Sequence, residues 1–253
     1  AYEISLGLVG SEMCIRDSSG GVIVPPKNYF KRMSVICKKN GILFIADEVV
    51  TGFRTSKSGA QGYFGITPDM CTMAKILAGG LPGGAVGGKA DIINMIQFRD
   101  DEEFNSNTRI PHNGTYNANP LSAVAGATAL GLVANTPVND TANAMADRLK
   151  KGLNTMLSET ETLGRATGVA SMVFIRLGVD INSDDDLYEF GSAEYKKILD
   201  PAMLQQFNLA LYSHGIHASH RFILGSKHSE QDIDDTVDSV SKAIDDLKKE
   251  GFL

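Results

Sequence analysis

Two short apolar runs, each followed by charged side chains, constrain the fold of this chain most strongly. Residues 43–46 read LFIA and precede Asp47 and Glu48, and residues 70–74 read MCTMA and precede Lys75. Continuous apolar runs of this length are typical of buried parallel strands, whose carboxyl ends meet at the ligand-binding edge of an α/β sheet. The sequence therefore predicts that a carboxylate and an amine face one pocket at that edge.

A lysine and a carboxylate in a shared dry pocket suit chemistry on a carbonyl group. Desolvation disfavours the charged form of an amine, and only the neutral amine attacks a carbonyl carbon, as Schiff-base formation requires. A carboxylate that faces a pyridine nitrogen keeps that nitrogen protonated, so that the ring accepts electrons from a carbanion. Lys75 and Asp47 are the candidates for these roles. Taken singly, an acidic pair at a strand end is more often a helix cap, and an isolated lysine is more often on the surface.

Longer strings around these residues resemble the pyridoxal-phosphate site of the class III aminotransferases. They are DEVVTGFR at 47–54, YFGITPDMCTMAK at 63–75 and GGLPGGAVGG at 79–88. Within that class, the arginine after Gly52 and Phe53 and the later Gly-Gly-Leu-Pro look most like those of the glutamate-1-semialdehyde aminomutases. The separation of Asp47 from Lys75 is similar to the family's separation of ring aspartate and Schiff-base lysine. The resemblance covers about residues 20–253.

The resemblance implies the cofactor and its contacts. Pyridoxal 5′-phosphate would be bound by Lys75, the catalytic residue, with Asp47 at the ring nitrogen and Val49 packed against the ring. Gly114 and Thr115 match the position that binds the cofactor phosphate of a neighbouring subunit, so the resemblance implies a homodimer. The substrate would be a small amino acid or amino aldehyde.

The segment that contains Gly114 and Thr115 also departs from the aminomutases. They usually show Gly-Thr-Leu-Ser-Gly-Asn-Pro, whereas residues 114–120 here read GTYNANP. A hydroxyl and a backbone N–H suit a phosphate oxygen. The competing interpretation is a helix cap before Pro120, which Asn119 could supply alone. The departure leaves open an ω-amino acid:pyruvate-type transaminase as the alternative to an aminomutase.

Strand, helix and strand alternate in the first half of the chain, which predicts an α/β fold. The resemblance implies the fold type I of pyridoxal-phosphate-dependent transferases, with a partial large domain at 19–138 that has a mainly parallel sheet. A small C-terminal α+β domain is expected at 139–253. The expected helices are 29–40, a short one from 91, 121–133, 139–158, 201–212 and 230–249, and the expected strands are 20–26, 43–46, 70–74, 171–177 and 214–224. Residues 99–111 are expected to form a polar loop.

Residues 1–18, AYEISLGLVGSEMCIRDS, do not read like the rest. Back-translated, they fit a sequencing-library adapter that ends in a transposon mosaic end, so we expect a non-native segment and a gene that continued upstream. A secretory signal is a poor alternative, because there is no basic n-region and charges interrupt the apolar run. The family implies an upstream half with a glycine/serine loop for the phosphate and an aromatic ring that stacks on the cofactor, and without it a catalytically inactive fragment is a further alternative.

Composition excludes several other classes of protein. The net charge is −6 with no sustained basic cluster, so neither nucleic acid nor an anionic membrane surface is an expected partner. The three cysteines have no metal-ligand spacing and are too few for a disulfide framework, which predicts no metal site and a cytoplasmic location. No G-x-G-x-x-G opens a helix after a strand, which argues against dinucleotide binding. Arg176 and Arg221 could bind a substrate carboxylate, although surface positions are the commoner outcome.

Overall fold

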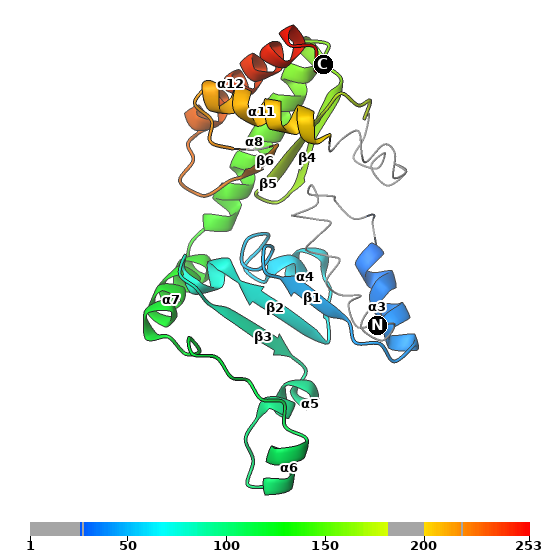
Figure 1. The fold of residues 1–253 in the computed structure, drawn as a ribbon, viewed down its shortest axis with the longest axis vertical. Helices are drawn as coiled ribbons and strands as arrows, with labels where there is room; N and C mark the ends of the chain where they lie inside the picture. The colour runs from blue at the N-terminus through cyan, green and yellow to red at the C-terminus, as the bar shows by residue number, and fades with distance from the viewer. Residues whose placement is uncertain (1–25, 27, 182–199, 219) are drawn as a thin grey trace. The chain divides into compact units, whose positions relative to one another are not determined.

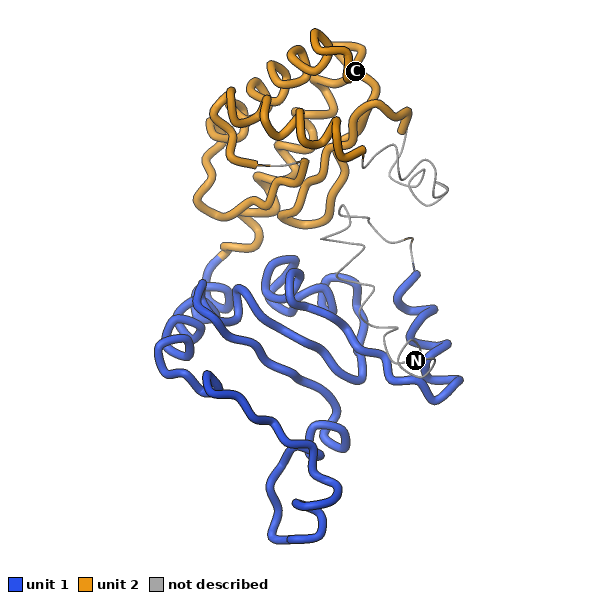
Figure 2. Tube along the Cα trace, viewed as in Figure 1, with its two compact units in different colours: residues 1–15, 28–136 blue, residues 16–27, 137–253 orange. Residues whose placement is uncertain are grey.

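The structure is a computed structural model that describes residues 26, 28–181, 200–218 and 220–253. The chain divides into two compact units, Asn28–Thr136 and Pro137–Leu253, which are coloured separately in Figure 2. The segment 1–18 and, except for Pro26, the expected strand at 20–26 lie outside the described residues. The predicted domain boundary at 138/139 lies two positions beyond the junction of the units.

The first unit is built on a three-stranded sheet in the order β1 (Ile45–Glu48), β2 (Met70–Ala74) and β3 (Gly84–Gly88) (Figure 1). β1 and β2 are parallel, as predicted, but β2 and β3 are antiparallel, so the described sheet is mixed rather than mainly parallel. The prediction of a glycine-rich turn at 79–88 is wrong for the second half of that segment, because glycine is depleted in strands and gives no local strand signal. In the structure, the second half of that segment pairs with the whole of β2.

Helices pack on one face of β1. Phe30 of α3 (Tyr29–Lys39), Ala46 of β1 and Ala60 of α4 (Gly59–Phe64) form a small buried cluster, in which Phe30 meets Phe64 edge to face. The expected loop at 99–111 instead contains a helix, because the side chain of Asp101 caps it by accepting from Phe104 N. The remaining short elements are α5 (Ala90–Ile93), η3 (Asn94–Ile96) and α6 (Glu102–Asn107).

The helix α7 (Pro120–Asn135) packs on the short 3₁₀ helix η2 (Lys75–Ala78). Gly126 makes the approach possible, since a Cβ there would collide with the carbonyl oxygen of Leu77. The side chain of Asn119 caps α7 by accepting from the first N–H groups of the helix. In the described part of the chain no single helix is long and apolar enough to cross a membrane, although α7 and the helix that follows it pass that test of length and composition together.

Asp69 ties the three strands of this sheet together at one end. Its carboxylate accepts from the backbone N–H of Phe44 at 2.7 Å and forms an ion pair with Lys89. Its backbone N–H donates to Phe44 O at 2.7 Å, and its carbonyl accepts from Lys89 N at 2.9 Å. One residue therefore joins the entry to β1, the start of β2 and the end of β3.

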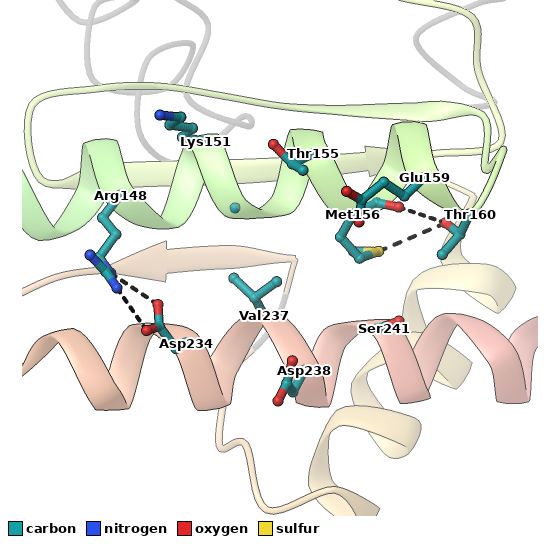
Figure 3. Close-up of a pocket in the computed structure, with 11 residues that line it drawn as sticks. Arg148, Lys151, Thr155, Met156, Glu159, Thr160, Asp234, Val237, Asp238 and Ser241 are labelled. Atoms are coloured by element: carbon teal, nitrogen blue, oxygen red, sulfur yellow. Dashed lines mark hydrogen bonds and ion pairs between the residues drawn. The ribbon is translucent and has the colours of Figure 1, made fainter.

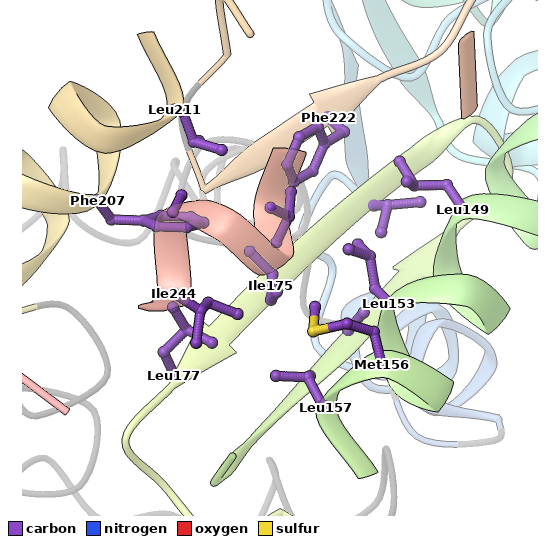
Figure 4. Packing of buried hydrophobic residues seen from close by; sticks show 14 of the residues in the cluster. Leu149, Leu153, Met156, Leu157, Ile175, Leu177, Phe207, Leu211, Phe222 and Ile244 are labelled. Atoms are coloured by element: carbon purple, nitrogen blue, oxygen red, sulfur yellow. The ribbon is translucent and has the colours of Figure 1, made fainter. Parts of the chain in front are cut away.

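The second unit is an α+β arrangement with an antiparallel sheet in the order β4 (Gly164–Val169), β5 (Met172–Leu177) and β6 (Arg221–Ile223). Every residue of β5 is buried, and the core in Figure 4 is completed by side chains of α8 (Val138–Glu159), α11 (Pro201–Ser213) and α12 (Glu230–Lys249), together with Phe222 of β6. β4 was not predicted because four of the six residues in its sequence, GRATGV, are glycine or polar. Of the described residues within the strand expected at 214–224, only the three residues of β6 form a strand.

The helix α12 has the predicted bounds and the predicted apolar face. Ile233, Val240, Ile244 and Leu247 are each at most 1% exposed. Ser229 caps the helix in a reciprocal capping box with Asp232, whose carboxylate accepts from the backbone N–H of Ser229.

Candidate active site

Asp47 lies in β1, and one of its two carboxylate oxygens is held in place. Oδ1 accepts hydrogen bonds from the backbone N–H of Val49 at 3.0 Å and from the hydroxyl of Thr72 at 3.1 Å. Among the described residues, Oδ2 accepts none. The carboxylate is thus oriented by two donors and keeps one oxygen available to a ligand that donates an N–H.

The other member of the acidic pair points to the opposite side of the sheet. Glu48 is 1% exposed, and its carboxylate accepts from the hydroxyl of Thr51, from Ala60 N at 2.9 Å and from Gln61 N at 2.8 Å. Successive strand residues face opposite sides, so adjacent carboxylates are separated into two environments. Glu48 caps α4 and anchors the loop between β1 and α4 from the core side.

A glycine makes room for this buried carboxylate. Gly59 has a φ of +66°, and a Cβ there would lie 2.8 Å from both oxygens of Glu48. The anchored loop also contains Arg54, and burial lowers the pKa of its guanidinium below the ordinary value.

Lys75 follows the last residue of β2 and begins η2, with a left-handed φ of +53°. It lines a pocket of about 550 Å³ together with Ile76, Gly79, Gly80, Leu81 and Ala129. In the described residues its amine has no hydrogen-bond or ion-pair partner. The side chain is exposed, so the dry environment predicted for it is wrong for this part of the chain. As far as the described residues form them, the pocket walls come from η2, the glycine turn and α7, which leaves the lysine side chain exposed.

The parallel pairing of β1 and β2 brings Asp47 and Lys75 to the same end of the sheet. Asp47 is the register partner of Thr72, three residues before Lys75. In parallel strands both carboxyl ends point the same way, so the amine emerges just beyond the strand that neighbours the carboxylate. These two predicted site residues therefore lie at one edge of the sheet.

The remaining predicted site residues are less closely tied to this edge. Val49 is half-buried, and its N–H orients Asp47. Gly114 and Thr115 lie in an exposed turn that is closed by a hydrogen bond from Asn117 N to Gly114 O at 3.0 Å. Among the described residues, no hydrogen bond links that turn to Asp47 or Lys75.

Arg176 and Arg221, the two arginines considered for a substrate carboxylate, belong to the second unit. Arg176 is only 2% exposed, so the expectation of a surface position is wrong for it. It lies on the wholly buried strand β5, donates to the hydroxyl of Thr167 and stacks 4.3 Å from the ring of Phe174. Arg221 is half-buried.

A groove of about 530 Å³ in the second unit contains none of the predicted site residues. It runs between α8 and α12 and includes Lys151, Thr155 and Val237 (Figure 3). Arg148 at its edge is already paired with Asp234 at 2.7 Å and with Glu230 at 3.0 Å. No cluster of three or more metal-ligating side chains occurs in the described ranges.

Comparison with known proteins decides the family. Residues 16–219 match the family model described as aminotransferase class-III, which is well over half of the chain. The chain belongs to the class III aminotransferases. This family uses pyridoxal 5′-phosphate, and its fold is that of the fold type I transferases, as predicted.

Relatives within the class III aminotransferases include both aminomutases and transaminases. The glutamate-1-semialdehyde 2,1-aminomutase of Methanococcoides burtonii is 31% identical over 222 residues, which are 87% of this chain and 49% of the relative. An omega-transaminase from Sphaerobacter thermophilus superposes with a TM-score of 0.75 at 28% identity, covering 94% of this chain and 55% of that one. The β-phenylalanine aminotransferase of Variovorax paradoxus shares the fold, with a TM-score of 0.69 at 23% identity over 96% of this chain and 56% of that one. The chain spans about half the length of the curated relatives that it matches.

The donor set at the edge of the sheet fits the family's cofactor. A pyridinium ring needs an acceptor for its N–H, and Oδ2 of Asp47 is open while Oδ1 is held. An aldehyde needs an amine, and Lys75 supplies one beside a pocket of ligand size. The described residues of this unit thus fit the ring and the aldehyde of pyridoxal phosphate.

The roles of two residues that shape this part of the sheet, Thr72 and Glu48, were not predicted from the sequence. Thr72 was read only as part of an apolar run, although a hydroxyl in such a run, at the register position of an acidic residue, is a signal for a cross-strand hydrogen bond. Glu48 was grouped with Asp47 at the edge. Strict alternation along a strand would have separated them.

Proposed function

We propose that this chain carries the lysine and aspartate of a pyridoxal-phosphate-dependent aminotransferase or aminomutase that resembles glutamate-1-semialdehyde 2,1-aminomutase. The observation that supports the proposal best is the parallel pairing that brings Asp47 and Lys75 to one edge of the sheet. The relative from Methanococcoides burtonii supports the aminomutase as the leading form of the activity.

Each predicted residue has a role in this proposal. Lys75 would hold the cofactor through its amine, Asp47 would accept the ring N–H at Oδ2, and Val49 would pack against the ring. Gly114 and Thr115 would bind the cofactor phosphate of a neighbouring subunit, which makes a homodimer part of the proposal. When bound, the cofactor supplies an electron sink that stabilises negative charge on the substrate carbon.

Lys75 also serves as the proton carrier in this mechanism. Its Nζ, once free, takes a proton from the substrate carbon that bears the nitrogen and returns a proton as general acid. The amine needs freedom to move between these positions. Its exposed side chain beside the pocket, without a partner among the described residues, is consistent with that need.

A second candidate is an ω-amino acid:pyruvate-type transaminase. The structural similarity to the omega-transaminase from Sphaerobacter thermophilus favours it. An aminomutase completes the reaction on one carbon skeleton, whereas a transaminase needs a keto acid as second substrate. We further propose a cytoplasmic location, which the free thiols Cys37 and Cys71 support.

The test of the proposed function is borohydride reduction of the chain after it has been mixed with pyridoxal phosphate, followed by mass mapping of the modified lysine. We expect a visible absorbance band and one dominant adduct on Lys75. Lys75→Ala should lose both, while Lys31→Ala, which changes an exposed helical lysine, should keep both. A wild-type chain that is modified only at scattered surface lysines would refute the proposal, whereas adduct without turnover would identify an inactive fragment.

If the adduct forms, product analysis separates the two activities. Conversion of glutamate-1-semialdehyde without a keto acid supports the aminomutase. Formation of alanine that depends on added pyruvate supports the transaminase.

A further inference from the structure

The hydroxyl of Thr72 is placed where it can hold the carboxylate of Asp47. The two residues are register partners on the parallel strands β1 and β2, and the hydroxyl donates to Oδ1 at 3.1 Å. Directly paired residues of neighbouring strands project from the same face of a sheet, so this contact is a consequence of the register.

The second donor to Oδ1 comes from a different direction. Val49 N lies two residues along the chain, where the strand has ended, and donates at 3.0 Å. A backbone donor and a side-chain donor on a neighbouring strand together restrict the carboxylate to one rotamer. Because both bonds end on Oδ1, Oδ2 is the oxygen left for a ligand.

The face that carries these residues is the open face of β1. Asp47 and Ile45 are half-buried, whereas Ala46 and Glu48 on the other face are buried. Val86, the partner of Thr72 on β3, is 51% exposed. A ligand that reaches Asp47 from this side therefore meets Thr72 as part of the same surface.

A valine at position 72 would fit the strand as well as threonine does, but it could not donate the hydrogen bond to Asp47. It has nearly the shape of threonine, and both residues are favoured in strands. We propose that Thr72 is a positioning residue, whose hydroxyl holds Oδ1 of Asp47 so that Oδ2 receives the ring N–H of the cofactor. This inference rests on the proposed function for the role of Asp47.

The first arm of the test needs no cofactor. Three-bond NMR couplings report the χ1 rotamer of Asp47 in the wild-type chain, in Thr72→Val and in Thr72→Ser. We expect one rotamer in the wild type, averaging in Thr72→Val and a return to one rotamer in Thr72→Ser, which restores the hydroxyl. A single unchanged rotamer in a folded Thr72→Val chain would overturn the inference. If Thr72→Val does not fold, Thr72→Ala takes its place with the same expected averaging.

The second arm measures cofactor affinity by absorbance titration. Loss of a hydrogen bond to a charged group predicts roughly tenfold or greater weakening in Thr72→Val, with Thr72→Ser close to wild type. In a chain that already carries Asp47→Asn, the same Thr72→Val change should have little further effect, because the two residues act as a unit. Full additivity of the two substitutions contradicts the inference.

The two arms separate this inference from the proposed function. If the wild-type chain forms no adduct at Lys75 but the Asp47 rotamer depends on Thr72, the cofactor assignment fails, while Thr72 is confirmed to hold the carboxylate of Asp47. If the adduct forms and affinity is the same in Thr72→Val, the cofactor assignment stands and the positioning role is wrong.

Discussion

Asp47 and Glu48 are adjacent in the sequence but do different things in the structure. The carboxylate of Asp47 lies on the open face of the sheet and has an available oxygen, whereas that of Glu48 is buried and accepts three hydrogen bonds. A buried carboxylate with three donors is a structural anchor, because most of its roughly four lone-pair sites are already used. Only the first of the pair is therefore available for chemistry.

At the residue scale, the surroundings of His220 predict how the free energy of unfolding depends on pH. Burial first, and then the positive charges of Arg221 and Arg176, lower its pKa to about 4. The unfolded histidine binds a proton near pH 6.5, so between about pH 6.5 and 4 the unfolded state holds more protons than the folded state. The free energy of unfolding should therefore be highest above pH 6.5 and fall as the pH drops toward 4.

The substitution His220→Gln isolates this effect, because glutamine does not titrate. Urea unfolding at several pH values should show a smaller loss of stability between pH 6.5 and 4 in the variant than in the wild type. Carboxylates such as Asp246 also make stability depend on pH, because hydrogen bonds from His214 and Lys249 lower its pKa. Their contribution is the same in the wild type and the variant, so it cancels when the two pH profiles are subtracted. Parallel pH profiles for the two chains would show that His220 titrates normally.

At the scale of elements, the start of α4 depends on Glu48. Its two oxygens accept separately from Ala60 N and Gln61 N, so Glu48→Gln would place an amide donor against one of these N–H donors. One buried N–H would lose its acceptor, and we expect a loss of about 1–3 kcal/mol in the free energy of unfolding. Urea denaturation measures it, with the exposed Glu159→Gln as the matched control, expected to change stability by less than about 0.5 kcal/mol.

A Glu48→Gln chain as stable as its control would mean that the loop rearranges to satisfy α4 without this carboxylate. Hydrogen exchange at Ala60 and Gln61 would then remain slow in the variant. Fast exchange confined to this loop is the expected result, because only α4 and the loop depend directly on the anchor.

The elements that sequence reasoning predicted well are those with a strong local signal. α12 has a periodic apolar face and a serine cap, and β2 is a short apolar run, and both have the predicted bounds. β3 and β4 were missed because their glycines carry no strand preference and only pairing with β2 and β5 makes them strands. The exposure of Lys75 was not predictable from its neighbours along the chain, because other segments determine whether a strand end is dry.

At the scale of the whole molecule, the chain spans about half the length of its curated relatives. The family resemblance implies a phosphate-binding loop and a stacking aromatic ring, which we expect in the half of the relatives that this chain does not match. A helix N-terminus in that half would add backbone donors for the phosphate. We therefore expect weak cofactor binding by this chain and at least roughly tenfold tighter binding by a version extended with a segment that corresponds to that half.

Absorbance titration of the two proteins side by side checks this expectation. The extended protein with Lys75→Ala is the control, because it retains the phosphate loop but lacks the amine. Equal affinity of the extended and unextended wild-type chains would mean that the residues described here already complete the binding site.

The hydrogen bonds and the ion pair of Asp69 have consequences for evolution as well as for stability. Side chains alternate strictly along a strand, so a slip of β1 by one position against β2 would turn the carboxylate of residue 47 to the opposite face and bring Glu48 in its place. Asp69 opposes such a slip by joining Phe44 to the start of β2 and by holding Lys89. A mutation at position 69 is thus expected to abolish the proposed activity while Asp47 and Lys75 stay unchanged, so selection for that activity would also act on Asp69.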